Sequence, residues 1–123
     1  MIAVVPLAAV SPPRALPSCL GKPTVRPSSV VLACADANFG MRKLVWRGWG
    51  RATARATGTA YANDCNPNCA AGHFHSYPAV LVSSGRQVCH GVPSHARLRI
   101  SFPGRTPFPK ATPADLVYPR RCS

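Results

Sequence analysis

The chain has 123 residues and six cysteines, and the cysteines constrain its fold more than any other feature. A chain of this length is sized for one domain with a modest core. An even number of cysteines in a short chain is typical of a disulfide framework, which forms in an oxidising compartment. Six cysteines allow many pairings. The pairing that we predict is Cys19–Cys34, Cys65–Cys69 and Cys89–Cys122.

The N-terminal residues support the same compartment. Residues 2–10 form an apolar stretch, and small residues and prolines follow at 11–15. The stretch is similar to the end of the hydrophobic region of a signal peptide, although it lacks the usual positive start, and it is too short to span a bilayer. A short apolar N-terminal strand is the alternative. Together with the cysteines, this segment predicts a secreted, extracellular protein.

Apolar and polar side chains alternate with a period of two along the chain. In residues 97–102 the apolar side chains share one face, whereas Arg97 and Arg99 lie on the other. In residues 52–62 one face is all alanine and glycine, and the other face is bulky. Such alternation is typical of half-buried strands. Further strands are expected at 29–33, 44–50 and 77–82. We therefore predict an all-β fold: a small antiparallel β-sandwich or open barrel of about five strands, stapled by disulfides.

The prolines divide the chain into three parts. The 14 prolines lie outside residues 28–66, and proline fixes φ and removes a backbone donor, so it disfavours regular structure. We expect a signal-peptide-like, proline-rich lead-in at 1–18, a β-domain at 19–103, and a proline-rich C-terminal arm at 104–123. Cys122 would hold that arm in place.

Three sequence blocks occur in a fixed order within the expected β-domain. They read CADAN at 34–38, WRGWG at 46–50 and NDCNPNCAAG at 63–72. In this order the blocks resemble those of a group of small secreted actinobacterial proteins, over about residues 27–102. The resemblance implies export and the extent of the domain, and it implies no particular chemistry.

One cluster of residues admits two interpretations. Cys65, Cys69, His73 and His75 lie within eleven residues, and two thiolates with two imidazoles can hold tetrahedral zinc. However, their spacing is not a standard zinc arrangement, and thiols in an oxidising compartment pair with each other. We predict a disulfide that closes the turn at 66–68, with no metal. A metal-binding protein that uses His73 and His75 is the alternative.

No catalytic constellation is present in the sequence. Asp36 opens a segment that looks like a calcium loop, but no later acid completes the coordination, and an Asx turn explains it better. We expect Asp36 and Asp64 to pair with buried or half-buried arginines. No serine lies in a nucleophile elbow, and no glycine-rich phosphate loop exists. The expectation is therefore a protein without catalytic residues or a cofactor.

The charge balance indicates the kind of partner. Fifteen Lys and Arg residues face three acids, which gives a net charge of +12. Such a charge attracts polyanions, although a codon bias toward arginine would produce it without any partner. The bases are scattered, so we expect no specific nucleic-acid partner. The candidate binding surface, with one tryptophan and three arginines, comprises Trp49, Arg55, Arg97 and Arg99.

Two functions of different class follow from these features. The first is a secreted, non-enzymatic binding protein that associates with an anionic cell-wall polymer or a membrane surface. The second is a small secreted inhibitor or effector that docks a protein through the loop at residues 63–72, with Asn66, Pro67 and Asn68 at its tip. No sequence feature identifies a small-molecule ligand or an oligomeric state.

Overall fold

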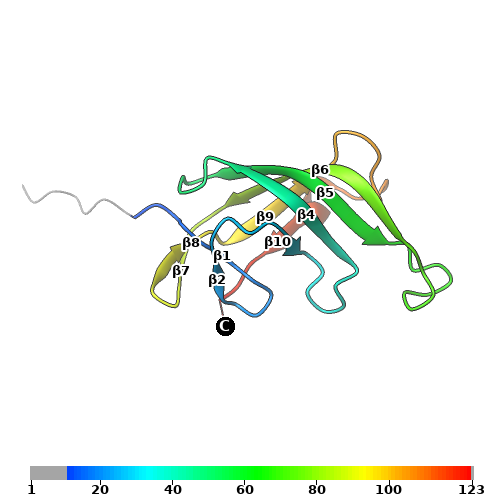
Figure 1. The fold of residues 1–123 in the computed structure, drawn as a ribbon, viewed down its shortest axis with the longest axis horizontal. Coiled ribbons are helices and arrows are strands. Elements are labelled where there is room, and N and C mark those ends of the chain that lie inside the picture. Colours follow the sequence, from blue (N-terminus) through cyan, green and yellow to red (C-terminus); the bar gives the residue numbers. More distant parts are fainter. Residues whose placement is uncertain (1–10, 123) are drawn as a thin grey trace, which may run out of the picture.

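The computed structural model describes residues 11–122, and the apolar stretch at 2–10 lies outside these residues. The fold is all-β, as the sequence predicts, and it includes one short 3-10 helix (Figure 1). The strands and this helix, in chain order, are β1 (Leu16–Pro17), β2 (Pro23–Thr24), β3 (Val30–Val31), β4 (Phe39–Arg47), β5 (Ala54–Asn63), β6 (Phe74–Ser84), β7 (Gln87–Cys89), β8 (Val92–Ser94), β9 (Arg97–Ser101), η1 (Pro113–Leu116) and β10 (Val117–Pro119).

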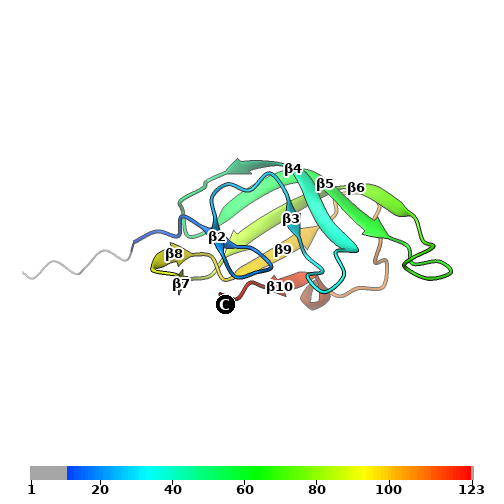
Figure 2. The ribbon, with the colours of Figure 1, turned by 60° about the horizontal axis from the view of Figure 1, so that its bottom comes forward.

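A single antiparallel sheet dominates the molecule. Its six strands follow the order β10-β9-β6-β5-β4-β3, and β1–β2 and β7–β8 form separate two-stranded ribbons. The sheet curls into a half-barrel, with β1 and β2 beneath the curl (Figures 1 and 2). The long strands β4, β5 and β6 have 9, 10 and 11 residues and provide most of its surface. This architecture confirms the open-barrel form of the prediction.

The alternating sequence patterns determine which side chains the half-barrel encloses. On β9, Leu98 and Ile100 are buried whereas Arg97 and Arg99 are exposed. The alanine face of β5 is buried in the same way, and its small side chains let the neighbouring strands pack closely. Leu16 of β1 joins the core from below. The sheet therefore has an apolar inner face and a polar outer face, as expected for a half-buried antiparallel sheet.

The strand β4 differs from the prediction because it contains a bulge. It begins at Phe39 and ends at Arg47, whereas the sequence predicts a strand over 44–50. Its register with β5 shifts between Arg42 and Val45, and Lys43 there adopts a φ of 56°. A bulge inserts an extra residue and breaks the period of two. Beyond Arg47, the positive φ of Gly48 turns the chain off the sheet.

The C-terminal segment contributes to the sheet instead of forming a purely irregular arm. Within residues 104–122, the strand β10 pairs with β9, and Val117 lies opposite Arg99. Pro119 is tolerated there because β10 is an edge strand, where a missing amide donor costs no ladder hydrogen bond.

Three disulfides join Cys19 to Cys34, Cys65 to Cys69 and Cys89 to Cys122. The predicted pairing is confirmed. Three disulfides in a domain of this size indicate an oxidising compartment. Within residues 11–122, no helix is long and apolar enough to cross a membrane.

Candidate functional site

Three arginines from three strands lie in one row across the outer face of the sheet. Arg47 of β4 is opposite Arg55 of β5, Arg55 is opposite Val82 of β6, and Val82 is opposite Arg99 of β9. Directly paired residues of an antiparallel sheet project from the same face. Neighbouring strands are about 4.8 Å apart, so Arg55 and Arg99 lie roughly 10 Å apart at the backbone. We call Arg47, Arg55 and Arg99 the arginine row.

A shallow hollow adjoins one end of the arginine row. Arg97 and Arg99 line it on β9, and Val82 of β6 also contributes to its lining. The remaining lining residues are Thr53, Ser84 and Val117. The hollow therefore presents two guanidinium groups beside hydroxyl and methyl groups, a combination that suits an anionic ligand.

None of the three acids neutralises this row. Asp36 and Asp115 cap turns: the backbone N–H of Asn38 donates to Asp36 (3.1 Å), and that of Thr112 donates to Asp115 (2.7 Å). Asp64 forms the one ion pair within residues 11–122, with His75 at 2.9 Å. The expected Asx turn at Asp36 is confirmed, whereas the expected pairing of Asp36 and Asp64 with arginines is wrong. Short carboxylate side chains in these loops satisfy nearby amides first.

The structure separates Trp49 from the other members of the predicted binding surface. Trp49 packs on Trp46 with 4.9 Å between the ring centroids, and its other neighbour is the ring of His95 at 6.1 Å. Trp46 lies opposite the buried Ala56 and donates its indole N–H to the carbonyl of Pro27 (2.8 Å). Both indoles thus pack against the core. The arginines share the outer face, and Trp49 does not.

A second group on the outer face combines an arginine with aromatic rings. Arg42 donates to the hydroxyl of Ser76 (3.1 Å), and the rings of Tyr61 and Phe74 meet edge to face at 6.0 Å. Phe74 is 57% exposed despite its size. These four residues line an open depression. Exposed aromatic faces beside arginine allow stacking as well as charge attraction.

The loop between β5 and β6 presents Asn66, Pro67 and Asn68 to solvent. The Cys65–Cys69 disulfide closes it. The Asn63 side chain fastens the base of the loop: its oxygen accepts from the N–H of Cys65 (2.9 Å), and its nitrogen donates to the carbonyl of Cys69 (2.8 Å).

Further contacts continue this support through the loop. The carboxylate of Asp64 accepts from the N–H of Asn66 (3.1 Å) and of His73 (3.0 Å). The side chain of Asn68 accepts from the N–H of Ala71 (2.9 Å). A Cβ added at Gly72 would come within 2.8 Å of the backbone nitrogen of Cys65, so only glycine fits there. The loop is therefore both exposed and well braced.

The same contacts bear on the metal-binding alternative. The sulfurs of Cys65 and Cys69 are bonded to each other, so neither offers a thiolate to a metal ion. His73 and His75 are exposed, and His75 lies against Asp64. The described part of the chain contains no group of three His, Cys, Asp or Glu residues that could hold a metal ion.

The Asp64 contacts lead to a prediction about pH. Hydrogen bonds from the N–H of His73, then from His75 and from the N–H of Asn66, lower the pKa of Asp64 to about 2 from its ordinary 3.8. Because the folded pKa is depressed, the support that Asp64 gives the loop is complete above pH 3.8 and is lost as the pH falls through about 2. A side-chain carboxyl titration followed by NMR should give a midpoint near 2, with faster amide exchange at Asn66 and His73 below it. An Asp64 midpoint at or above 3.8 would contradict this assignment.

Two surfaces thus stand out among the described residues, the arginine-bearing outer face and the braced loop at Asn66–Asn68. Comparisons with protein-family models, with curated proteins and with solved structures give no match for the chain, and the geometry of these two surfaces carries the functional inference.

Proposed function

We propose that this chain is a secreted, non-enzymatic binding protein that associates with an anionic polymer or membrane surface through the outer face of its half-barrel. The arginine row carries the proposal, because it places three cations on three strands without a carboxylate to neutralise them. The three disulfides, the apolar stretch at residues 2–10 and the resemblance to small secreted actinobacterial proteins support export.

The chemistry of the face suits repeated anionic groups. A guanidinium group binds a phosphate or carboxylate with two parallel hydrogen bonds. The sheet holds the arginine row at fixed spacing, so several anionic groups of one polymer can bind together. The chain's net charge of +12 adds long-range attraction. Binding of this kind gains free energy from counterion release, so its affinity falls steeply as salt rises.

The experiment compares two variants of equal charge. One replaces the arginine row (Arg47→Gln, Arg55→Gln, Arg99→Gln). The matched control replaces three exposed cations outside the strands of the sheet (Arg14→Gln, Lys22→Gln, Lys110→Gln). Binding to vesicles of phosphatidylglycerol and phosphatidylcholine, and to polyphosphate, is measured between about 50 and 200 mM salt.

The row variant should lose at least about tenfold in affinity at low salt, and its log–log salt slope should be shallower by about 2 to 3. The control should retain most of the affinity, because it removes only long-range attraction. Equal losses in the two variants, or binding by the wild type that ignores salt, would contradict the proposal.

The braced loop supports a second candidate, an inhibitor or effector that docks a protein. Its tip is exposed while its backbone is held by a disulfide and by the Asn63 and Asp64 side chains. A preorganised loop loses little conformational entropy when it binds. This candidate predicts a salt-insensitive interaction that Pro67→Gly and Asn66→Ala weaken and that the row variant leaves unchanged.

A further inference from the structure

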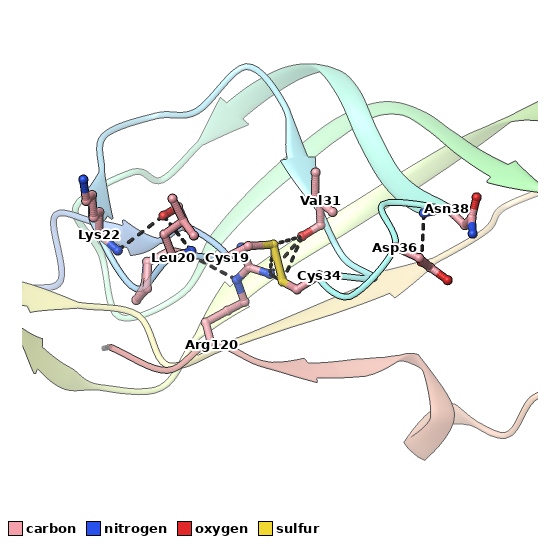
Figure 3. Close-up of a disulfide and its surroundings, with 10 residues drawn as sticks. Cys19, Leu20, Lys22, Val31, Cys34, Asp36, Asn38 and Arg120 are labelled. Atoms are coloured by element: carbon pink, nitrogen blue, oxygen red, sulfur yellow. Dashed lines mark hydrogen bonds between the residues drawn. A yellow bond between two sulfur atoms is a disulfide. The ribbon is translucent and has the colours of Figure 1, made fainter.

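Arg120 is a buried cation that the outer-face proposal does not use. It follows β10, and only 5% of its surface is exposed. Its backbone N–H donates to the carbonyl of Ala96 (2.8 Å), and its own carbonyl accepts from the side chain of Gln87. These bonds fix the backbone, and the side chain extends to the Cys19–Cys34 disulfide and to Val31 (Figure 3).

Within residues 11–122, every partner of the Arg120 guanidinium is electrically neutral. Its Nε donates to the carbonyl of Pro17 (3.1 Å), and its Nη1 donates to the carbonyl of Val31 (2.9 Å) and lies 3.4 Å from the sulfur of Cys34. A guanidinium has five N–H groups. These contacts use three of them, and the two on Nη2 have no partner among the described residues.

The free end of Arg120 is not sealed in the core. The buried side-chain atoms without a partner in residues 11–122 are the hydroxyl of Ser83 and Nδ1 of His95. Nη2 is not one of them, so it is not completely buried, although Arg120 as a whole is only 5% exposed. Burial lowers the pKa of Arg120 below its usual range, because desolvation disfavours the charged form. A desolvated cation without an anion is costly, and a bound anion would offset part of that cost.

A cavity of about 280 Å³ lies against Arg120. Most of its accessible lining is apolar, with polar groups in the minority. The residues that provide the apolar part include Leu16, Pro17, Pro27, Val30 and Val31. Such a pocket, apolar with a few fixed polar groups, is the usual form of a small-molecule site.

We propose that this cavity binds a small organic carboxylate with a short apolar chain. The carboxylate pairs with the free Nη2 edge of Arg120, and the chain lies against Leu16, Val30 and Val31. Arg120 is a single cation, and only its Nη2 group is available, so the site suits a ligand with one negative charge. A polymer of phosphates would need several cations and would not enter an apolar cavity. The site is separate from the arginine row, so the two proposals succeed or fail independently.

Binding is tested on the whole chain with hexanoate, with hexanol and hexylammonium as ligands of matched length. Hexanoate should bind about tenfold or more tighter than hexanol, because a charge-assisted hydrogen bond is gained, and hexylammonium should not bind. NMR shifts should concentrate at Thr24, Val30 and Val31. N-acetylleucine and its amide, tested in parallel, show whether the carboxylate is that of a free acid or of a peptide end. Equal binding of hexanoate and hexanol would overturn the proposal.

Two variants at exposed positions test the site without replacing the buried Arg120. Ser29 lies at the exposed edge of the cavity, and its neighbour Ser28 is exposed but does not line it. Ser29→Phe should reduce hexanoate binding about tenfold or more, and Ser28→Phe should leave it unchanged. Arg120→Gln, if it folds, should abolish the preference for hexanoate over hexanol. The row variant should bind hexanoate as the wild type does. Equal effects of Ser29→Phe and Ser28→Phe would also overturn the assignment.

Discussion

Replacement of both Cys89 and Cys122 by serine is expected to lower the free energy of unfolding by about 3–4 kcal/mol. These cysteines are separated by 33 residues, and their disulfide holds the chain just beyond β10. Loss of the cross-link restores the entropy of a long loop to the unfolded chain. Urea denaturation of the wild type and the variant measures the difference.

The Cys65–Cys69 disulfide provides the control for this prediction. It spans only 4 residues, so its removal should cost less, about 2 kcal/mol in the same loop-entropy model. The amide exchange that it accelerates should be confined to the loop at Asn66–Asn68, whereas the Cys89–Cys122 variant should also expose the amides of β10. Equal losses of stability in the two double variants would show that the C-terminal segment contributes little to the fold.

Leu98→Ala is expected to destabilise the protein by about 2–5 kcal/mol. Leu98 is fully buried on β9, between β6 and β10, so its truncation removes apolar contacts and leaves a cavity. Its neighbour Arg97 supplies the matched control, because the next residue of a strand projects from the opposite face. Arg97→Ala should change stability by no more than about 0.5 kcal/mol. Thermal and urea unfolding measure both, and a reversed order would mean that the inner and outer faces are assigned wrongly.

The strands that the sequence predicts most accurately are those with an uninterrupted period of two. Residues 97–102 and 52–62 alternate cleanly, and their counterparts β9 and β5 bury the faces that the alternation indicates. The β4 bulge breaks this rule, because Met41 and Leu44 are both buried although they are three apart. The sequence around residue 43 carries no signal for this bulge. The bulge depends on how β4 pairs with β5, which is a long-range property.

The predicted strand at 29–33 is longer than the observed strand β3. Only Val30 and Val31 form strand pairs with β4, and the ladder ends where the N–H groups of Leu32 and Ala33 both donate to one carbonyl, that of Phe39 at the start of β4 (2.9 and 3.0 Å). The chain therefore turns toward the first disulfide. An apolar run indicates burial, but it does not distinguish a paired strand from a tight turn that is also buried.

The arginines of the candidate site were predicted only where their own strand determines their exposure. The exposure of Arg97 and Arg99 follows from their own strand. Arg47 belongs to the row only because β4 pairs with β5 in one particular register. The bulge in β4 sets that register, and the sequence does not predict the bulge. Arg120 was not predicted, because its burial depends on carbonyl groups of Pro17 and Val31 that only the complete fold brings to it.

The contacts of Arg120 can form only when most of the described chain is present. They join positions separated by 103 and 89 residues, and they close the half-barrel between its two edge strands, β3 and β10. Contacts so distant along the chain form late and slow folding. A ribosome has to release nearly the whole described segment before this closure is possible. The disulfide Cys19–Cys34, which the Arg120 side chain contacts, forms in the oxidising compartment that the three disulfides indicate.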